Sequence, residues 1–139
     1  MNGMTDMDRA SVAYRNTAVQ TAAPDRLLLM LYDGLIQFLE AAKRALVEGR
    51  RADAHAFLLR SQDILRELTV TLKMDYEISH SLAALYDYYH RRLVEANVTK
   101  DPVPVEEVLE QVRELREAWA NAALALRQAS VRAEQLGSI

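Results

Sequence analysis

The chain has 139 residues, of which 50% are hydrophobic and 27% charged, so its length suits one compact domain and its apolar content excludes an intrinsically disordered chain. Four glycines and three prolines supply too few turn residues for an all-β fold, and the absence of cysteine excludes disulfides and thiolate metal ligands. The net charge of −3 excludes a chain that binds nucleic acid non-specifically through a basic surface.

The first segment, residues 1–23, has neither the basic start nor the continuous apolar run of an export signal. Tyr14 and Val19 are apolar, but the polar residues around them disrupt any helical period. We expect an arm or short helix that packs on the rest of the chain. The most apolar run, residues 27–39, is interrupted by Asp33 and Gln37 and is shorter than the ~20 residues that span a bilayer. We therefore expect a soluble, cytoplasmic protein without stable membrane insertion.

Residues 24–48 are predicted to form the first long helix. Pro24 suits a first-turn position, Asp25 complements the positive helix N-terminus, and Gly49 supplies the stop. The expected core stripe recurs at helical spacing and consists of Leu27, Leu28, Leu31, Leu35, Phe38, Ala42 and Leu46.

Three further amphipathic helices are predicted over residues 52–73, 76–98 and 104–135. Their connections are short, so successive helices should run antiparallel. The sequence therefore predicts an all-α fold: one antiparallel four-helix bundle over residues 24–136, with residues 1–23 as an arm packed on it.

The candidate ligand and catalytic residues favour structural roles. Glu77 and His80 have the spacing of a metal-binding Glu-x-x-His motif, but they fall off the core face and no second copy exists. His55 lies beside the core stripe of its helix, as a surface or half-buried histidine does. Ser61 lies on the core side and should donate to a backbone carbonyl. We predict no catalytic residue, no cofactor and no metal, and therefore no enzyme.

The first long helix carries more apolar side chains than one core stripe requires. Leu29, Ile36 and Val47 lie roughly 120 to 160° from the predicted core face, and Tyr32 and Leu39 bridge the two faces. Such a second apolar flank is either covered by the N-terminal arm, through Tyr14 and Val19, or offered to a partner helix. An arm that packs weakly combines both roles, because a better-packing partner displaces it. Other off-core residues that would extend this surface are Leu59, Val70, Tyr88, Val94 and Val98.

Two stretches of the chain form motifs centred on tyrosine. The first comprises Tyr14, Val19-Gln20-Thr21-Ala22, Pro24, Leu27 and Met30-Leu31-Tyr32-Asp33-Gly34. The second comprises Leu85-Tyr86-Asp87-Tyr88-Tyr89, Arg91-Arg92-Leu93 and Ala96-Asn97, and is followed by Leu115-Arg116 and Ala118-Trp119. Together, over about residues 14–120, these motifs resemble the signature of the FliS family, the flagellin-specific export chaperones.

The resemblance implies a cytoplasmic antiparallel helical bundle without catalytic activity. It implies that the partner is the disordered C-terminal segment of flagellin, which is kept from polymerising early and delivered to components of the flagellar type III export gate. The helical positions and the motifs together place the partner-binding groove at Leu29, Tyr32, Ile36 and Leu39, with Tyr14 and Val19 in the displaceable arm.

Two alternatives remain open at the level of sequence. The apolar flank would also suit a structural or regulatory module that self-associates, so the chain is expected to be a monomer or a weak homodimer. In the second motif, Tyr86, Tyr89 and Leu93 fall on the core stripe, which favours packing over direct partner binding. Asp87, Arg91 and Arg92 would then form a solvated face with weak ion pairs.

Overall fold

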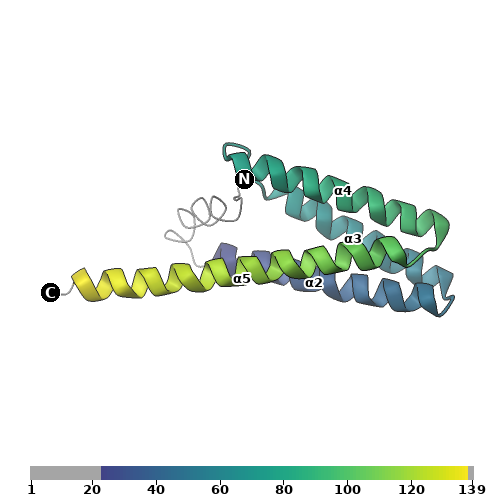
Figure 1. Cartoon of the computed structure of the whole chain (residues 1–139), viewed down its shortest axis with the longest axis horizontal. Coiled ribbons are helices and arrows are strands. Elements are labelled where there is room, and N and C mark those ends of the chain that lie inside the picture. The colour runs from purple at the N-terminus through teal and green to yellow at the C-terminus, as the bar shows by residue number, and fades with distance from the viewer. Residues whose placement is uncertain (1–22, 138–139) are drawn as a thin grey trace.

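The structure, a computed structural model, describes residues 23–137. Four α-helices make up most of this part of the chain: α2 (Ala23–Val47), α3 (Arg51–Val70), α4 (Glu77–Thr99) and α5 (Val103–Gly137). Figure 1 shows them as long helices that lie side by side, with the C-terminal part of α5 projecting past its neighbours. The predicted all-α bundle is confirmed. The predicted arm, including Tyr14 and Val19, lies outside the described residues except for Ala23, which begins α2.

The helices form a closed ring in which each one packs against two others. α2 contacts α3, α3 contacts α4, α4 contacts α5, and α5 returns to contact α2. α2 and α4 therefore lie diagonally across the bundle, as do α3 and α5. This ring order decides which flanks of the helices can share a surface.

The helix ends lie close to the predicted positions, and local hydrogen bonds explain the differences. α3 ends at Val70 rather than near Lys73. The Thr71 hydroxyl donates to the Leu68 carbonyl, and the Leu72 N–H, which would bond that carbonyl in a continuing α-helix, donates to the Thr69 carbonyl instead. Between α4 and α5, the Asp101 carboxylate accepts the Val103 N–H at 3.0 Å.

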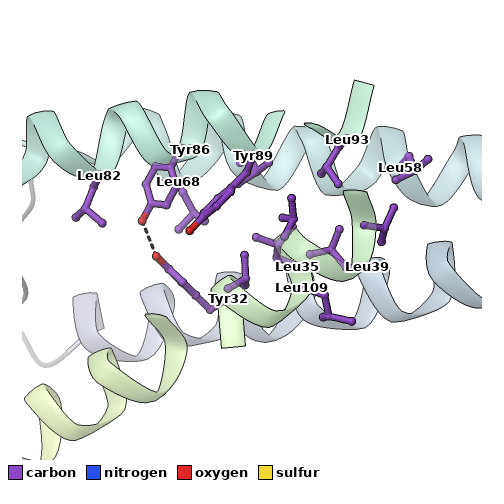
Figure 2. Packing of buried hydrophobic residues seen from close by; sticks show 14 of the residues in the cluster. Tyr32, Leu35, Leu39, Leu58, Leu68, Leu82, Tyr86, Tyr89, Leu93 and Leu109 are labelled. Carbon is purple, nitrogen blue, oxygen red and sulfur yellow. Dashed lines mark hydrogen bonds between the residues drawn. The ribbon is translucent and has the colours of Figure 1, made fainter. Parts of the chain in front are cut away.

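All four helices contribute aliphatic side chains to the core, and its buried aromatic side chains come from α2, α4 and α5. In Figure 2, Tyr32 of α2 and Tyr86 of α4 meet across the bundle with their hydroxyl oxygens 2.6 Å apart. The Trp119 indole N–H of α5 donates to the Tyr32 hydroxyl at 3.2 Å. Burial raises the pKa values of Tyr32 and Tyr86 well above the ordinary value for tyrosine. Both phenols therefore stay protonated and able to donate a hydrogen bond.

The buried stripe of α2 is rotated from the predicted one. Leu27 was expected in the core, yet 54% of its surface is exposed, whereas Tyr32 and Leu39 are fully buried beside Leu35 and Ala42. The physical reason is that α2 packs against both α3 and α5, so its buried arc is centred between those neighbours. Because α2 has apolar residues on several sides, its own pattern did not fix that centre.

Candidate functional site

The four residues predicted to form the partner-binding groove divide into two pairs. Tyr32 and Leu39 have no exposed surface and belong to the bundle core. Leu29 and Ile36 are half-buried and pack on the edge of that core. The described part of the chain therefore presents Leu29 and Ile36 near the surface, with Tyr32 and Leu39 behind them. Whether the four bind a partner stays a prediction.

Leu29 and Ile36 lie on the flank of α2 that faces α5. They alternate with two acidic residues, Asp33 and Glu40, at intervals of four, three and four residues, which places all four on one side of the helix. Arg116 of α5 donates to the Asp33 carboxylate at 2.9 Å. The flank is thus partly covered by α5.

Glu40 forms the second ion pair of this flank, with Arg113 of α5. The two ion pairs join α2 to α5 on either side of Ile36. Neither ion pair was predicted from the sequence. The alternation of apolar and acidic residues on one flank was the signal available in the sequence.

A second apolar surface lies between α3 and α4. Leu59, Val94 and Val98 are exposed, as predicted for off-core residues, and they line one hollow together. Its polar end is formed by His55, whose Nδ1 lies 2.8 Å from the Asn97 side-chain nitrogen. This hollow combines exposed apolar side chains with a hydrogen-bonded polar end.

The two apolar surfaces lie on opposite sides of the bundle. α2 and α5 border the first and α3 and α4 the second, and these two pairs of helices face each other in the ring. The prediction that Leu59, Val94 and Val98 extend the Leu29–Ile36 surface as one strip is therefore wrong. Helical periodicity locates residues on each helix, but it does not give the order of helices around the ring.

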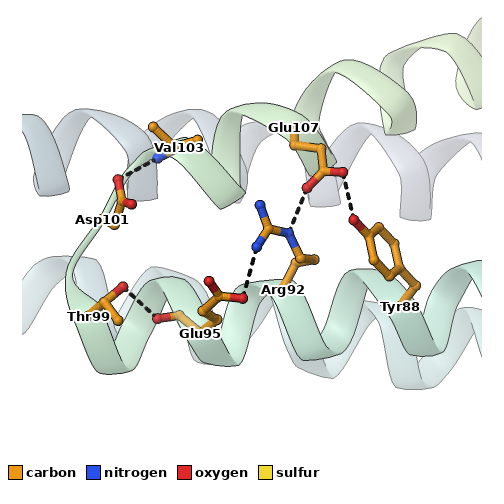
Figure 3. Close-up of polar contacts among 7 residues, drawn as sticks. All are labelled: Tyr88, Arg92, Glu95, Thr99, Asp101, Val103 and Glu107. Carbon is orange, nitrogen blue, oxygen red and sulfur yellow. Dashed lines mark hydrogen bonds and ion pairs between the residues drawn. The ribbon is translucent and has the colours of Figure 1, made fainter.

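Tyr88 lies on a third side, where α4 meets α5. Its hydroxyl donates to Glu107 at 2.7 Å, and the Arg92 guanidinium donates to the other oxygen of the same carboxylate at 2.6 Å (Figure 3). Both hydrogen bonds lower the pKa of Glu107, and the one from Tyr88 has the larger effect. Glu107 is therefore ionised and joins α4 to α5.

The second tyrosine motif divides in the way its helical spacing favours. Tyr86, Tyr89 and Leu93 are buried in the core. Asp87 and Arg91 form an ion pair at 3.1 Å with both side chains about two-thirds exposed, as expected for a solvated face. Arg92 differs from this prediction, since it is partly buried against Glu107.

The residues considered for chemistry occupy ordinary structural positions. Glu77 and His80 are exposed, and Ser61 is buried with its hydroxyl donating to the Phe57 carbonyl at 2.9 Å, as predicted. Within residues 23–137 no group of three or more His, Cys, Asp or Glu side chains is placed to hold a metal ion. None of the four described helices is long and apolar enough to cross a membrane.

A model of one protein family, described as "Flagellar protein FliS", matches residues 7–126 and so spans the core helices and both tyrosine motifs. The chain belongs to the FliS family. It is 39% identical over 110 residues to the flagellar secretion chaperone FliS of Bacillus subtilis, an alignment that covers 79% of this chain and 83% of the relative.

Relatives of lower identity align over a similar length. The flagellar secretion chaperone FliS of Escherichia coli is 32% identical, with 78% of this chain and 82% of the relative covered. That of Vibrio cholerae is 30% identical, with 77% and 83% covered. The FliS match ends at residue 126, whereas α5 continues to Gly137, so the projecting end of α5 lies beyond the matched region.

Proposed function

We propose that this FliS-family protein is a cytoplasmic, non-catalytic flagellar export chaperone that binds the C-terminal segment of flagellin. The observation that carries the proposal is family membership, together with relatives that are themselves named flagellar secretion chaperones. By holding that segment, the chaperone prevents premature polymerisation and keeps the subunit available to components of the flagellar export gate.

The flank of α2 facing α5 is the proposed primary contact. Leu29 and Ile36 accept apolar side chains of the flagellin segment, while Tyr32 and Leu39 form the rigid wall behind them. Full burial of a Leu or Ile side chain contributes about 1.5–3 kcal/mol. A few such anchors offset the ~2–5 kcal/mol that a disordered segment loses on ordering.

The hollow between α3 and α4 is a second apolar contact in this proposal. Because it lies opposite the α2 flank, one client that uses both surfaces has to pass around the bundle. A segment that is disordered before binding suits this geometry, since it folds onto each surface in turn. Val94 and Val98 are the proposed anchors on this side.

The N-terminal arm is proposed as a displaceable cover of the groove through Tyr14 and Val19. Any contact that stabilises the empty groove lowers the apparent affinity of a competing client. The double variant Tyr14→Ala/Val19→Ala in the full chain should therefore bind a flagellin C-terminal peptide more tightly than the unmodified protein. Equal or weaker binding, measured by isothermal titration calorimetry, would assign the arm no covering role.

The test of the function is direct binding of the same peptide. We expect a stoichiometric complex with more helix by circular dichroism than its separate components. Ile36→Asp should weaken binding by about tenfold or more, about 1.4 kcal/mol or greater, because it places a charge on the apolar flank. The matched control is Val131→Asp, since Val131 is exposed and lies beyond the family match.

Two outcomes would contradict this account. Absence of binding at micromolar concentration would overturn the proposed partner. Equal losses of stability and of binding in Ile36→Asp would make Ile36 a core residue instead of a contact. Sedimentation of the protein alone distinguishes the alternative, because a tight homodimer that buries Leu29 and Ile36 would favour a self-associating module.

A further inference from the structure

Another hollow, between α4 and α5, combines an apolar floor with an acidic rim. Leu85 of α4 and Leu115 of α5 are half-buried and form the floor with Ala118. Glu107, Glu110 and Glu114 of α5 line the same hollow, and Arg92 of α4 donates to Glu107.

Among the described residues 23–137, most of the rim's negative charge has no ion-pair partner. Glu107 is paired with Arg92, but Glu110 and Glu114 form no ion pair with any residue from 23 to 137. The neighbouring arginines of α5 point the other way, where Arg113 and Arg116 pair with Glu40 and Asp33 of α2. The basic side chains of this part of α5 are thus engaged at α2, which leaves its α4 side acidic.

Tyr89 also lines the hollow, and its pKa is affected by this negative charge. Its phenol donates to the Gln111 side-chain oxygen at 3.0 Å. Burial, and then the negative charges of Glu114 and Glu107, raise the pKa of Tyr89 to about 12. The negative charges of Glu107 and Glu114 therefore both affect a side chain that lines the hollow.

The dimensions of the hollow suit a helix. From Glu107 to Glu114 the rim follows α5 for seven residues, roughly 10 Å or two helical turns. A third helix laid in the groove between two packed helices brings its residues at intervals of three and four against such a rim. Apolar residues of that helix would cover Leu85, Leu115 and Ala118, and basic residues on its flank would reach Glu110 and Glu114.

We propose that the α4–α5 hollow is a docking site for a basic amphipathic helix of a partner protein. Charge complementarity selects this occupant, because an acidic or neutral helix would leave two carboxylates desolvated without a counter-charge. The site is separate from the α2 flank and from the α3–α4 hollow. It does not depend on the proposed flagellin contacts.

The experiment uses the full-length protein and a synthetic helical peptide with a Leu/Ala face flanked by Arg. We expect methyl NMR signals of Leu85, Leu115 and Ala118 to shift on titration, and the affinity to fall as salt is raised. Glu110→Gln/Glu114→Gln should lower the affinity by about tenfold. Ala118→Arg, which fills the hollow and adds a positive charge, should also weaken binding.

The control for net charge is Glu67→Gln/Asp75→Asn, which removes two exposed acidic groups away from the hollow. This variant should bind like the unmodified protein. Equal losses in both double variants, shifts that map to another face, or no binding of the Arg peptide would overturn the proposal. A peptide with Glu in place of Arg should not bind, and its binding would contradict the role of charge. Flagellin-peptide affinity measured on the same variants tests the proposed function separately.

Discussion

The apolar side chains of α2 form two groups that differ in what a change to them should affect. Tyr32 and Leu39 are fully buried and contact the bundle interior, whereas Leu29 and Ile36 are half-buried on the flank beside α5. The two groups are interleaved along roughly three turns of the same helix, from Leu29 to Leu39. One helix therefore carries an interior group that fixes the bundle and a flank group near the surface, and the proposal assigns client binding to the flank group.

The largest effect is expected from Leu39→Ala. Removing a fully buried Leu side chain leaves a cavity, and such changes cost about 2–5 kcal/mol. Chemical denaturation should show this loss in the free energy of unfolding. The fraction that remains folded should bind a flagellin C-terminal peptide with nearly unchanged affinity. A loss of affinity without a loss of stability would place Leu39 in the contact surface and remove the distinction between the two groups.

A smaller effect is expected from Tyr32→Phe, which keeps the ring and removes the hydroxyl. The Tyr86 hydroxyl then loses its partner in the core, and an unsatisfied buried polar group costs about 1–3 kcal/mol. Thermal or denaturant unfolding measures the change. The double variant Tyr32→Phe/Tyr86→Phe should recover part of this loss of stability, because it also removes the unsatisfied Tyr86 hydroxyl. No recovery in the double variant would show that the two hydroxyls do not act as a pair.

The smallest and most gradual effect is expected from alkaline pH, which reports on the interior tyrosines. Tyr89 has a folded pKa of about 12, above the unfolded value near 10. A raised folded pKa means that the folded state binds more protons, so stability falls as pH rises from 10 to 12. Denaturant unfolding at pH 9 and pH 11 should show the decline, and Tyr89→Phe should reduce it. A flat profile would contradict the burial of these phenols.

Much of the fold follows from the sequence, because helical periodicity, Pro24, Gly49 and short connections are local signals. Ser61 illustrates how far local reasoning extends, since its buried position and its bond to a backbone carbonyl were both predicted and are confirmed. The residue at which α3 ends was harder to predict from the sequence. It depends on whether the Thr71 hydroxyl or the Leu72 N–H bonds the Leu68 carbonyl.

The candidate site could be predicted only in part, because it depends on how helices are rotated and ordered around the ring. The extra apolar residues of α2 were recognisable, but Tyr32 and Leu39 could be assigned to the interior only once Tyr86 and Trp119 were seen to meet Tyr32. The acidic character of the α4–α5 hollow could not be predicted from the sequence for a similar reason. Within residues 23–137, Glu110 and Glu114 form no ion pair because Arg113 and Arg116 turn toward α2, and no pattern within α5 alone specifies that choice.

The central claim is that the flank of α2, and not its interior face, contacts flagellin. The most direct measurement is methyl NMR of the protein as a flagellin C-terminal peptide is added. The account predicts contacts between peptide protons and the methyl groups of Leu29 and Ile36, with none to Leu39. Peptide contacts confined to other helices, with Leu29 and Ile36 unchanged at saturation, would contradict it.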